Sequence, residues 1–246
     1  MLLSLRPCLL ASAGALLLLL LLPPSTTLAA TMQERVRQLM IGEIGGNLQI
    51  DEFIGGSNGF LATPSRLACG TWDRQCRWRN AIGDSGQAFR MRGQPDFPSF
   101  RRAVGNNYVP SDYVPLVVPF GAGAPSGSTV TIESDPVQTT PNARLIVAFN
   151  AWLAPQHLLR PGQLPFIDVC YKAVGANPLE GCVAARRTNQ TPVVAQSILV
   201  PNKNYVQLVI RLKSQTSSQT SYALLDDIRV FQRAARYRNG RRRQRN

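Results

Sequence analysis

Residues 204–212 read NYVQLVIRL, and this stretch decides the fold class. Its inner apolar residues fall at every second position, namely Val206, Leu208, Ile210 and Leu212. A period of two is typical of a β-strand that buries one face and turns the other away from the core. The stretch therefore predicts a sheet with one face packed on a hydrophobic core.

Further stretches of the same kind lie on both sides of it. Three are clear, at 143–153, 164–171 and 222–231, and five are weaker, at 47–54, 88–92, 114–120, 128–133 and 193–200. Clusters of Gly, Pro, Asn and Ser separate them, and no helix alternates with them as a parallel sheet would require. The pattern predicts an all-β fold, an antiparallel β-sandwich or jelly roll over residues 47–232. The segment 93–113 has little periodicity and is predicted to be a long surface loop.

Residues 1–30 have the features of a secretory signal peptide. Arg6 precedes an apolar stretch over 8–22, which at about 15 residues is shorter than the roughly 20 needed to cross a bilayer. Small residues at Ala29 and Ala30 offer a cleavage site. We expect a secreted, extracellular protein without a transmembrane segment.

A short amphipathic helix is expected over residues 31–46. Thr31 and Glu34 have the spacing of a capping box, and Gly42 is expected to end the helix. One helical face is apolar and consists of Met32, Val36, Leu39 and Met40.

Four cysteines remain after the leader is removed: Cys69, Cys76, Cys170 and Cys182. An even number of cysteines in a secreted chain favours disulfides. Proximity in the sequence favours the pairs Cys69–Cys76 and Cys170–Cys182 among the three possible connectivities. A zinc site is disfavoured, because the spacings are not those of zinc ligands and the chain has one histidine, His157.

The chain is basic, and its charge is concentrated at the C-terminus. Lys and Arg number 27 against 14 Asp and Glu, which gives a formal net charge of +13. The end of the chain from residue 229 holds eight arginines and no acid, and residues 233–246 are expected to form a disordered tail. The tail arginines expected to bind polyanions are Arg236, Arg238, Arg241, Arg242, Arg243 and Arg245.

Three interpretations of this tail remain open. Arginine pairs bidentately with sulfate, and sulfated glycans are more plausible partners than nucleic acid outside the cell. The run Arg241–Arg243 could also be a protease site that releases a peptide. A solvated tail that only keeps the protein soluble is the third interpretation.

The closing strand resembles a known extracellular family. Residues 223–228 (ALLDDI) resemble the Ala-Leu-Asp-Asp-Ile motif that ends MAM domains, and residues 69–72 (CGTW) resemble the family's Cys-Gly-Trp. Trp78-Arg79 resembles its later Trp-x-Arg. The family's first cysteine is missing near Asn47, and basic residues replace its acidic motif before Trp78. The resemblance implies a jelly-roll module that makes contacts between proteins and is not itself catalytic.

One carboxylate is a candidate metal ligand. Asp226 has the sequence parity of Leu224, Ile228 and Val230, so it is expected to point toward the core. A buried carboxylate needs a partner. Calcium could supply one, with Asp51 and Glu52 as further ligands, whereas hydrogen bonds to backbone amides or an arginine are the alternative. No other cofactor is expected.

No residue pattern indicates catalysis. His157 lies in a proline-flanked loop without a nucleophile motif beside it, so the chain is expected not to be an enzyme. Trp152 is expected to lie in the core, whereas Trp72 and Trp78 flank the small cysteine loop and are expected to pack over it. Asn189 is in the one N-glycosylation sequon.

These observations predict a secreted binding or adhesion module of the extracellular matrix or cell surface. Its expected partners are extracellular proteins and, through the tail, heparin-like sulfated glycans. The alternatives are a carbohydrate-active or carbohydrate-binding sandwich and a precursor cleaved at Arg241–Arg243.

Overall fold

The computed structural model describes residues 24–55, 59–84, 86–110, 114–121, 124–187 and 194–233. The leader up to residue 23, the sequon residue Asn189 and the arginine tail from residue 234 lie outside the described residues. No described helix is long and apolar enough to cross a membrane.

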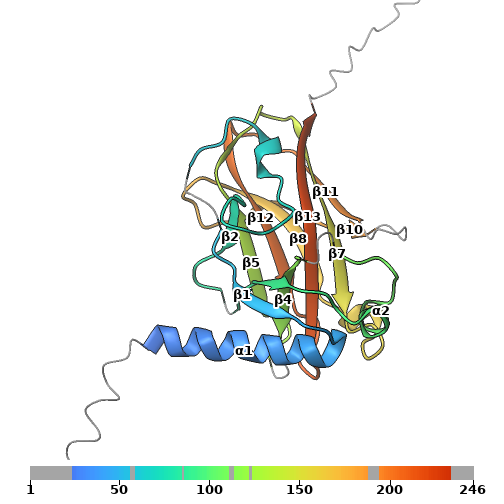
Figure 1. The fold of residues 1–246 in the computed structure, drawn as a ribbon. Coiled ribbons are helices and arrows are strands. Elements are labelled where there is room, and N and C mark those ends of the chain that lie inside the picture. The colour runs from blue at the N-terminus through green and yellow to red at the C-terminus, as the bar shows by residue number, and fades with distance from the viewer. Residues whose placement is uncertain are drawn as a thin grey trace, which may run out of the picture.

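The described chain is an antiparallel β-sandwich of two sheets (Figure 1). The seven-stranded sheet contains, in spatial order, β1 (Gln49–Glu52), β3 (Phe89–Arg92), β4 (Leu116–Phe120), β13 (Ser221–Arg233), β7 (Arg144–Ala154), β11 (Val194–Leu199) and β10 (Arg186–Arg187). The six-stranded sheet contains β2 (Trp78–Asn80), β5 (Thr129–Ser134), β12 (Tyr205–Lys213), β8 (Phe166–Ala173) and β9 (Glu180–Ala184), with β6 (Val137–Gln138) paired to β12.

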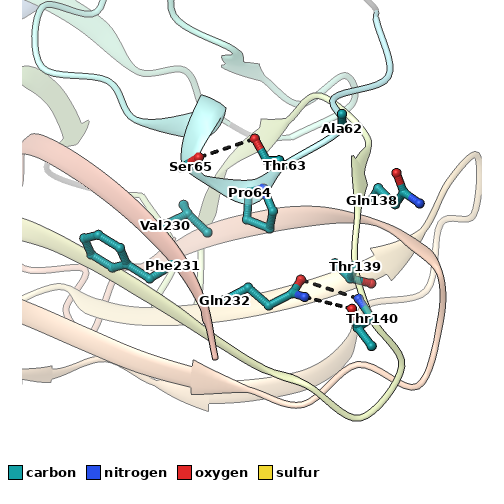
Figure 2. A pocket seen from close by; sticks show the side chains of 10 residues that line it. All are labelled: Ala62, Thr63, Pro64, Ser65, Gln138, Thr139, Thr140, Val230, Phe231 and Gln232. Carbon is teal, nitrogen blue, oxygen red and sulfur yellow. Dashed lines mark hydrogen bonds between the residues drawn. The ribbon is translucent and has the colours of Figure 1, made fainter. Parts of the chain in front are cut away.

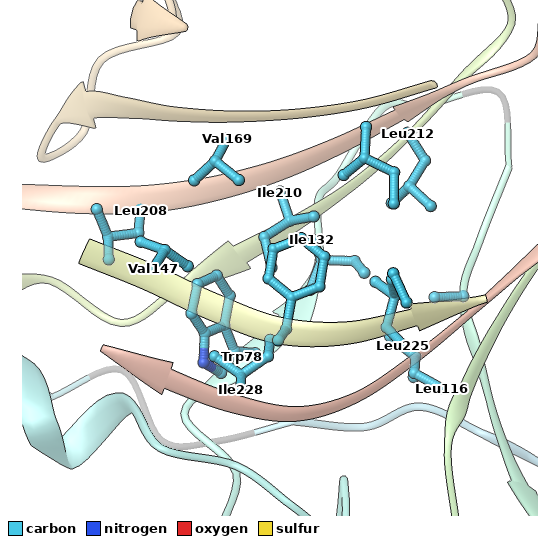
Figure 3. Packing of buried hydrophobic residues seen from close by; sticks show 14 of the residues in the cluster. Trp78, Leu116, Ile132, Val147, Val169, Leu208, Ile210, Leu212, Leu225 and Ile228 are labelled. Carbon is cyan, nitrogen blue, oxygen red and sulfur yellow. The ribbon is translucent and has the colours of Figure 1, made fainter. Parts of the chain in front are cut away.

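The main hydrophobic core lies between the two sheets (Figure 3). The alternating residues of β12 all face it, as their period of two requires, and Trp78 of β2 is buried among them. Leu225 and Ile228 of β13 contribute from the opposite sheet. The antiparallel sandwich predicted from the sequence is confirmed.

A second core lies on the outer face of the seven-stranded sheet, under two helices. Helix α1 (Pro24–Ile44) packs there through Val36, Met40 and Ile44, and α2 (Phe97–Val104) packs beside it. Trp152 and Tyr222 of the sheet form the other side of this core. The helix expected over 31–46 exists, but it is already helical before Thr31, so Thr31 is not its N-cap, and it continues past Gly42.

Helix α2 corrects the prediction of a surface loop over 93–113. The Asp96 side chain accepts a hydrogen bond from the backbone N–H of Ser99 at 3.0 Å and caps the N-terminus. Gly105 ends the helix in the left-handed conformation, with φ of 71°. Its buried residues Phe100, Ala103 and Val104 lie at helical spacing, so the sequence does carry a helical period over these two turns.

A β-bulge in β13 corrects the predicted face of Asp226. Register with β7 shifts between Asp226 and Arg229, and Asp227 has φ of +50°. Leu224 faces the second core, whereas Ile228 faces the main core on the other side of the sheet. Asp226 therefore shares a face with Leu224 but not with Ile228 and Val230, although it is fully buried as predicted.

Two short 3-10 helices, η2 (Pro64–Leu67) and η4 (Pro161–Gln163), lie in the connections. Turn η2 lies at the end of the sandwich opposite α1, near the C-terminal end of β13 (Figure 1). It lies beside a basic pocket and borders a neutral groove.

Candidate functional site

The candidate site is a pocket of about 560 Å³ in which three arginines converge. We call it the arginine pocket, and its lining residues are Leu61, Arg66, Arg74, Gln75 and Arg77. No carboxylate lines it. The arginines come from three short segments that have little regular structure, so other contacts must fix their positions.

Arg66 is held by the packing of η2. Pro64 occupies the first turn, where its fixed φ favours a helical start, and Leu67 is fully buried. The indole Nε1 of Trp78 donates a 2.8 Å hydrogen bond to the carbonyl oxygen of Leu67. The backbone around Arg66 is therefore fixed by the main core, while its side chain is exposed.

Arg74 and Gln75 lie in the loop closed by the Cys69–Cys76 disulfide. The Asp73 carboxylate accepts hydrogen bonds from the Thr71 hydroxyl at 2.9 Å and from the backbone N–H of Gln75 at 2.8 Å. The first of these is the largest cause of a lowered pKa at Asp73, so the carboxylate stays ionised and keeps the turn ordered.

Trp72 anchors the same loop to the core. Its φ is +49°, a left-handed conformation that is costly for a residue with a side chain. Burial of the ring and a 3.1 Å hydrogen bond from its Nε1 to the carbonyl oxygen of Leu225 offset that cost. The ring of Phe53 meets it edge-on at 5.5 Å.

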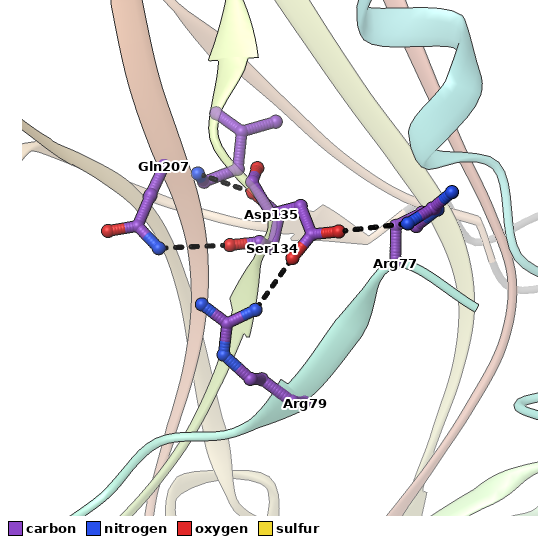
Figure 4. Close-up of polar contacts among 6 residues, drawn as sticks. Arg77, Arg79, Ser134, Asp135 and Gln207 are labelled. Atoms are coloured by element: carbon purple, nitrogen blue, oxygen red, sulfur yellow. Dashed lines mark hydrogen bonds and ion pairs between the residues drawn. The ribbon is translucent and has the colours of Figure 1, made fainter. Parts of the chain in front are cut away.

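Arg77 is positioned by a buried carboxylate (Figure 4). Asp135 is 0% exposed and pairs with Arg77 Nη1 at 3.5 Å and with Arg79 Nη1 at 2.7 Å. The backbone N–H of Asp135 also donates to the carbonyl oxygen of Arg77 at 2.8 Å. Two guanidinium groups thus share one carboxylate, which leaves excess positive charge at the edge of the pocket.

A hydrogen-bond network fixes Asp135 in turn. The Ser134 hydroxyl donates to the carbonyl oxygen of Asp135 at 2.8 Å and accepts from the N–H of Leu208 at 2.8 Å. Gln207 donates to the carbonyl oxygen of Ser134 at 3.2 Å. Through Asp135 and Ser134, the hydrogen-bond network therefore connects Arg77 to the central strand β12 (Figure 4).

Arg66 and Arg74 make no ion pair with any described residue. Guanidinium groups bind sulfate, phosphate and carboxylate in bidentate geometry. The pocket can therefore bind an anionic group, and Gln75 adds an amide that can donate to it or accept from a neighbouring hydroxyl.

The structure contains both cysteine pairs expected from the sequence. Cys69 is bonded to Cys76, and Cys170 of β8 is bonded to Cys182 of β9. The first disulfide closes the loop that carries Arg74. The second links two neighbouring strands of the six-stranded sheet and lies away from the arginine pocket.

The three expected calcium ligands do not meet. Asp51 and Glu52 are on β1, whereas Asp226 is on β13. The strands β3 and β4 lie between β1 and β13 in the sheet. Asp51 pairs with Arg92 at 2.6 Å. Within the described ranges, no three His, Cys, Asp or Glu residues gather as a metal site.

Trp152 is buried as expected, in the second core under the helices. Trp72 and Trp78 are buried in the main core, and His157 is exposed in its loop as expected. The tail arginines Arg236, Arg238, Arg241, Arg242, Arg243 and Arg245 lie outside the described residues.

The arginine pocket was not among the sites predicted from the sequence. Its signal was the density of basic residues around the small cysteine loop, since residues 66–79 hold four arginines besides the two cysteines. The C-terminal tail has a higher density of arginines, so anion binding was predicted there and not in residues 66–79. Arg66 lies close to Arg74 because η2 places it there, and the sequence did not predict η2.

Comparison with known proteins does not assign the chain to a family. No model of a known protein family matches it, and no curated protein sequence matches it. Solved structures with a partly similar fold include the enzymatically active domain of tailspike protein 4 of bacteriophage CBA120, at 9% identity and a TM-score of 0.42. That match covers 70% of this chain and 21% of the tailspike chain.

Two other solved structures are similar at the same level. The carbohydrate-binding module TmCBM61, in complex with β-1,4-galactotriose, matches at 9% identity and a TM-score of 0.31, over 50% of this chain and 73% of the module. The arabinose-bound α-L-arabinofuranosidase MgGH51 matches at 9% identity and a TM-score of 0.38, over 74% of this chain and 28% of the enzyme. At these values, none of the three assigns a function to the chain.

Proposed function

We propose that this protein is a secreted, non-catalytic binding module that recognises anionic groups of extracellular glycans in the arginine pocket. The observation that carries the proposal is the convergence of Arg66, Arg74 and Arg77 in one pocket without a lining carboxylate. The two disulfides fit an oxidising compartment. Sulfated and uronic-acid glycans are abundant polyanions there.

The pocket is suited to specific binding because its cations are partly ordered before a ligand arrives. Arg77 is oriented by Asp135, and a disulfide and an internal hydrogen-bond network constrain the loop that carries Arg74. Pre-ordering reduces the conformational entropy lost on binding. The tail arginines are proposed to add affinity for long polyanions, chiefly by salt-sensitive electrostatic attraction.

The test is calorimetric titration of the full chain with a short heparin-derived tetrasaccharide. The double variant Arg66→Gln/Arg74→Gln should weaken binding about 10- to 100-fold, since each charge-assisted hydrogen bond contributes roughly 1.5–3 kcal/mol before losses elsewhere. Arg101→Gln/Arg102→Gln is the matched control, because it removes the same charge from α2, at the far end of the sandwich (Figure 1).

The control separates a site from overall attraction to a basic protein. Weaker binding by the pocket variant alone supports the proposal. Equal losses in the two variants would show that net charge alone governs binding, and the proposed function would then be wrong.

Homophilic adhesion is a second candidate function, and it is the kind of role that the resemblance to MAM domains implies. Phe231, Ile146 and Ile198 lie side by side across β13, β7 and β11, and Phe231 and Ile198 are 49% and 46% exposed. Sedimentation velocity at rising concentration tests this candidate. A dimer that Ile198→Ser abolishes supports it, and a monomer throughout contradicts it.

A further inference from the structure

A neutral groove is lined in part by residues 62–65, which lie in the chain between Leu61 and Arg66 of the arginine pocket. Figure 2 shows the groove. It has a volume of about 570 Å³, and none of its lining side chains is charged. Thr63, Ser65, Gln138 and Thr140 supply hydroxyl and amide groups, while Phe231, which is 49% exposed, supplies apolar surface. We call it the neutral groove.

Part of this groove is fixed by its own hydrogen bonds. The amide of Gln232 donates to the Thr140 hydroxyl at 2.9 Å and accepts from the Thr140 N–H at 3.4 Å. The hydroxyls of Thr63 and Ser65 lie 3.3 Å apart (Figure 2). Gln138 is exposed at the rim, and its backbone N–H donates to the carbonyl oxygen of Leu61.

The edge of β13 adds backbone groups to the same groove. Ile228 directs its N–H and C=O away from β7, where both bond to Cys69 at 2.8 and 2.9 Å. Alternation along an antiparallel strand directs the N–H and C=O of Val230 and Gln232 to the same side. The strand β4 pairs with β13 only as far as Leu225, so this edge carries donors and acceptors that a ligand can use.

The groove and the arginine pocket share one wall. Ala62, Thr63, Pro64 and Ser65 line the groove, whereas Leu61 and Arg66, the residues on either side of them, line the pocket. One continuous backbone segment therefore lines both a cationic hollow and a neutral one that offers hydroxyls and amides.

We propose that the ligand is an oligosaccharide of mixed charge, which places an acidic residue in the arginine pocket and an uncharged sugar residue in the neutral groove. The inference rests on the proposed function, because it extends the ligand of the same site. Sugar hydroxyls match the hydroxyl, amide and backbone groups of the groove, and the apolar face of a sugar ring matches the exposed ring of Phe231. A fully sulfated chain would place a charge against a groove that has no counter-charge.

The experiment compares two probes on the full chain by calorimetric titration. One is glucuronic acid, and the other is a hyaluronan tetrasaccharide, in which acidic and neutral residues alternate. We expect the tetrasaccharide to bind at least tenfold more tightly. The groove variant Ser65→Ala/Gln138→Ala should abolish this advantage and leave the affinity for glucuronic acid unchanged.

Ser217→Ala/Gln219→Ala is the matched control, since it removes the same two polar groups from an exposed turn before β13. Two results together support the inference. The control variant should bind both probes like the wild type, and the groove variant should lose only its tighter binding of the tetrasaccharide. Binding of glucuronic acid with no tetrasaccharide advantage overturns the inference and leaves the proposed function standing. Failure of both the tetrasaccharide and the heparin-derived probe to bind overturns both.

Discussion

At the scale of single residues, Asp135 connects the fold to the arginine pocket. It is fully buried, and both of its ionic partners are arginines that are about one-third exposed or less. Breaking a buried ion pair by removing one partner leaves uncompensated charge, which typically costs about 3–5 kcal/mol. Part of that cost is relieved here because Arg77 and Arg79 can turn toward water.

We expect Asp135→Asn to lower the free energy of unfolding by about 2–4 kcal/mol, measured by urea denaturation. Asp227→Asn is the control, because Asp227 pairs with Arg229 at the surface and such pairs contribute about 0–1 kcal/mol. Similar small losses in both variants would contradict the importance given to the buried carboxylate.

The two adjacent aspartates of β13 differ in burial and in backbone conformation. Asp226 is 0% exposed and accepts a 2.9 Å hydrogen bond from the N–H of Asp227, whereas Asp227 is partly exposed with φ of +50°. Asp226→Ala should therefore destabilise the protein by about 1–3 kcal/mol, because it removes a buried acceptor and leaves its donors unpaired. Thermal unfolding measures the effect.

The companion substitution separates side-chain burial from backbone strain. Asp227→Gly should be nearly neutral, since glycine adopts a positive φ without steric cost, whereas Asp227→Ala should cost about 1 kcal/mol. If Asp227→Gly destabilised the protein more than Asp226→Ala, the assignment of the bulge would be wrong.

At the scale of elements, ion pairs between β8 and β12 make stability depend on pH. Burial acts to raise the pKa of Asp168, but hydrogen bonds from Lys213 and Arg211, both on β12, outweigh it and hold the pKa below its usual value. A carboxyl group with a lowered pKa in the folded state stabilises the fold above its unfolded pKa of about 3.9. This contribution disappears as pH falls through the lower, folded pKa.

We expect Asp168→Asn to be less stable than the wild type at pH 7, by about 2 kcal/mol, and the difference to shrink as the pH falls below about 4. Urea denaturation between pH 7 and pH 2.5 measures the two free energies. A gap that stays constant over this range would show that the difference arises from packing rather than from ionisation.

The sequence predicted the long elements better than the short ones. All nine predicted strands have counterparts, and the alternation of β12 is what placed the main core. The strands β2, β6, β9 and β10 were missed: three of them have only two or three residues, and β9 is exposed at nearly every position, so it buries no alternating face. Helix α2 was missed although Asp96 and Gly105 are good capping residues and its apolar residues lie at helical spacing, because the pattern extends over only eight residues.

The candidate site was predictable only in part. Closeness in sequence suggested the Cys69–Cys76 pair, and the structure contains it. Asp135 was not predictable as a partner, because it lies 58 residues from Arg77 in the chain and reaches it through tertiary packing. Arg66 is close to the loop in sequence, but its position depends on the short helix η2. Similarly, the bulge at Asp227 reversed the face of every later residue of β13, which strict parity cannot anticipate.

At the scale of the whole molecule, the seven-stranded sheet is buried on both faces near α1 and α2, whereas helices cover no other described sheet surface. The second core joins the N-terminal segment to strands from the middle and the end of the chain, including Trp152 and Tyr222. The helix before residue 47 is therefore part of the folded unit.

This arrangement predicts the effect of removing the helix. Val36, Met40 and Ile44 are each at most 2% exposed, and burying such a side chain contributes about 1.5–3 kcal/mol. The three together contribute roughly 5–9 kcal/mol, partly offset by the entropy lost when the helix orders. That is comparable with the whole free energy of unfolding of a typical domain, about 5–15 kcal/mol.

A chain that starts at Asn47 should therefore be far less stable than one that starts at Thr31, and should bind the dye ANS through its exposed second core. Met40→Ala in the longer chain provides an intermediate case, with an expected loss of about 2–5 kcal/mol. Equal urea midpoints for the chains that start at Thr31 and Asn47 would show that α1 only rests on the sheet, and that the sandwich folds without it.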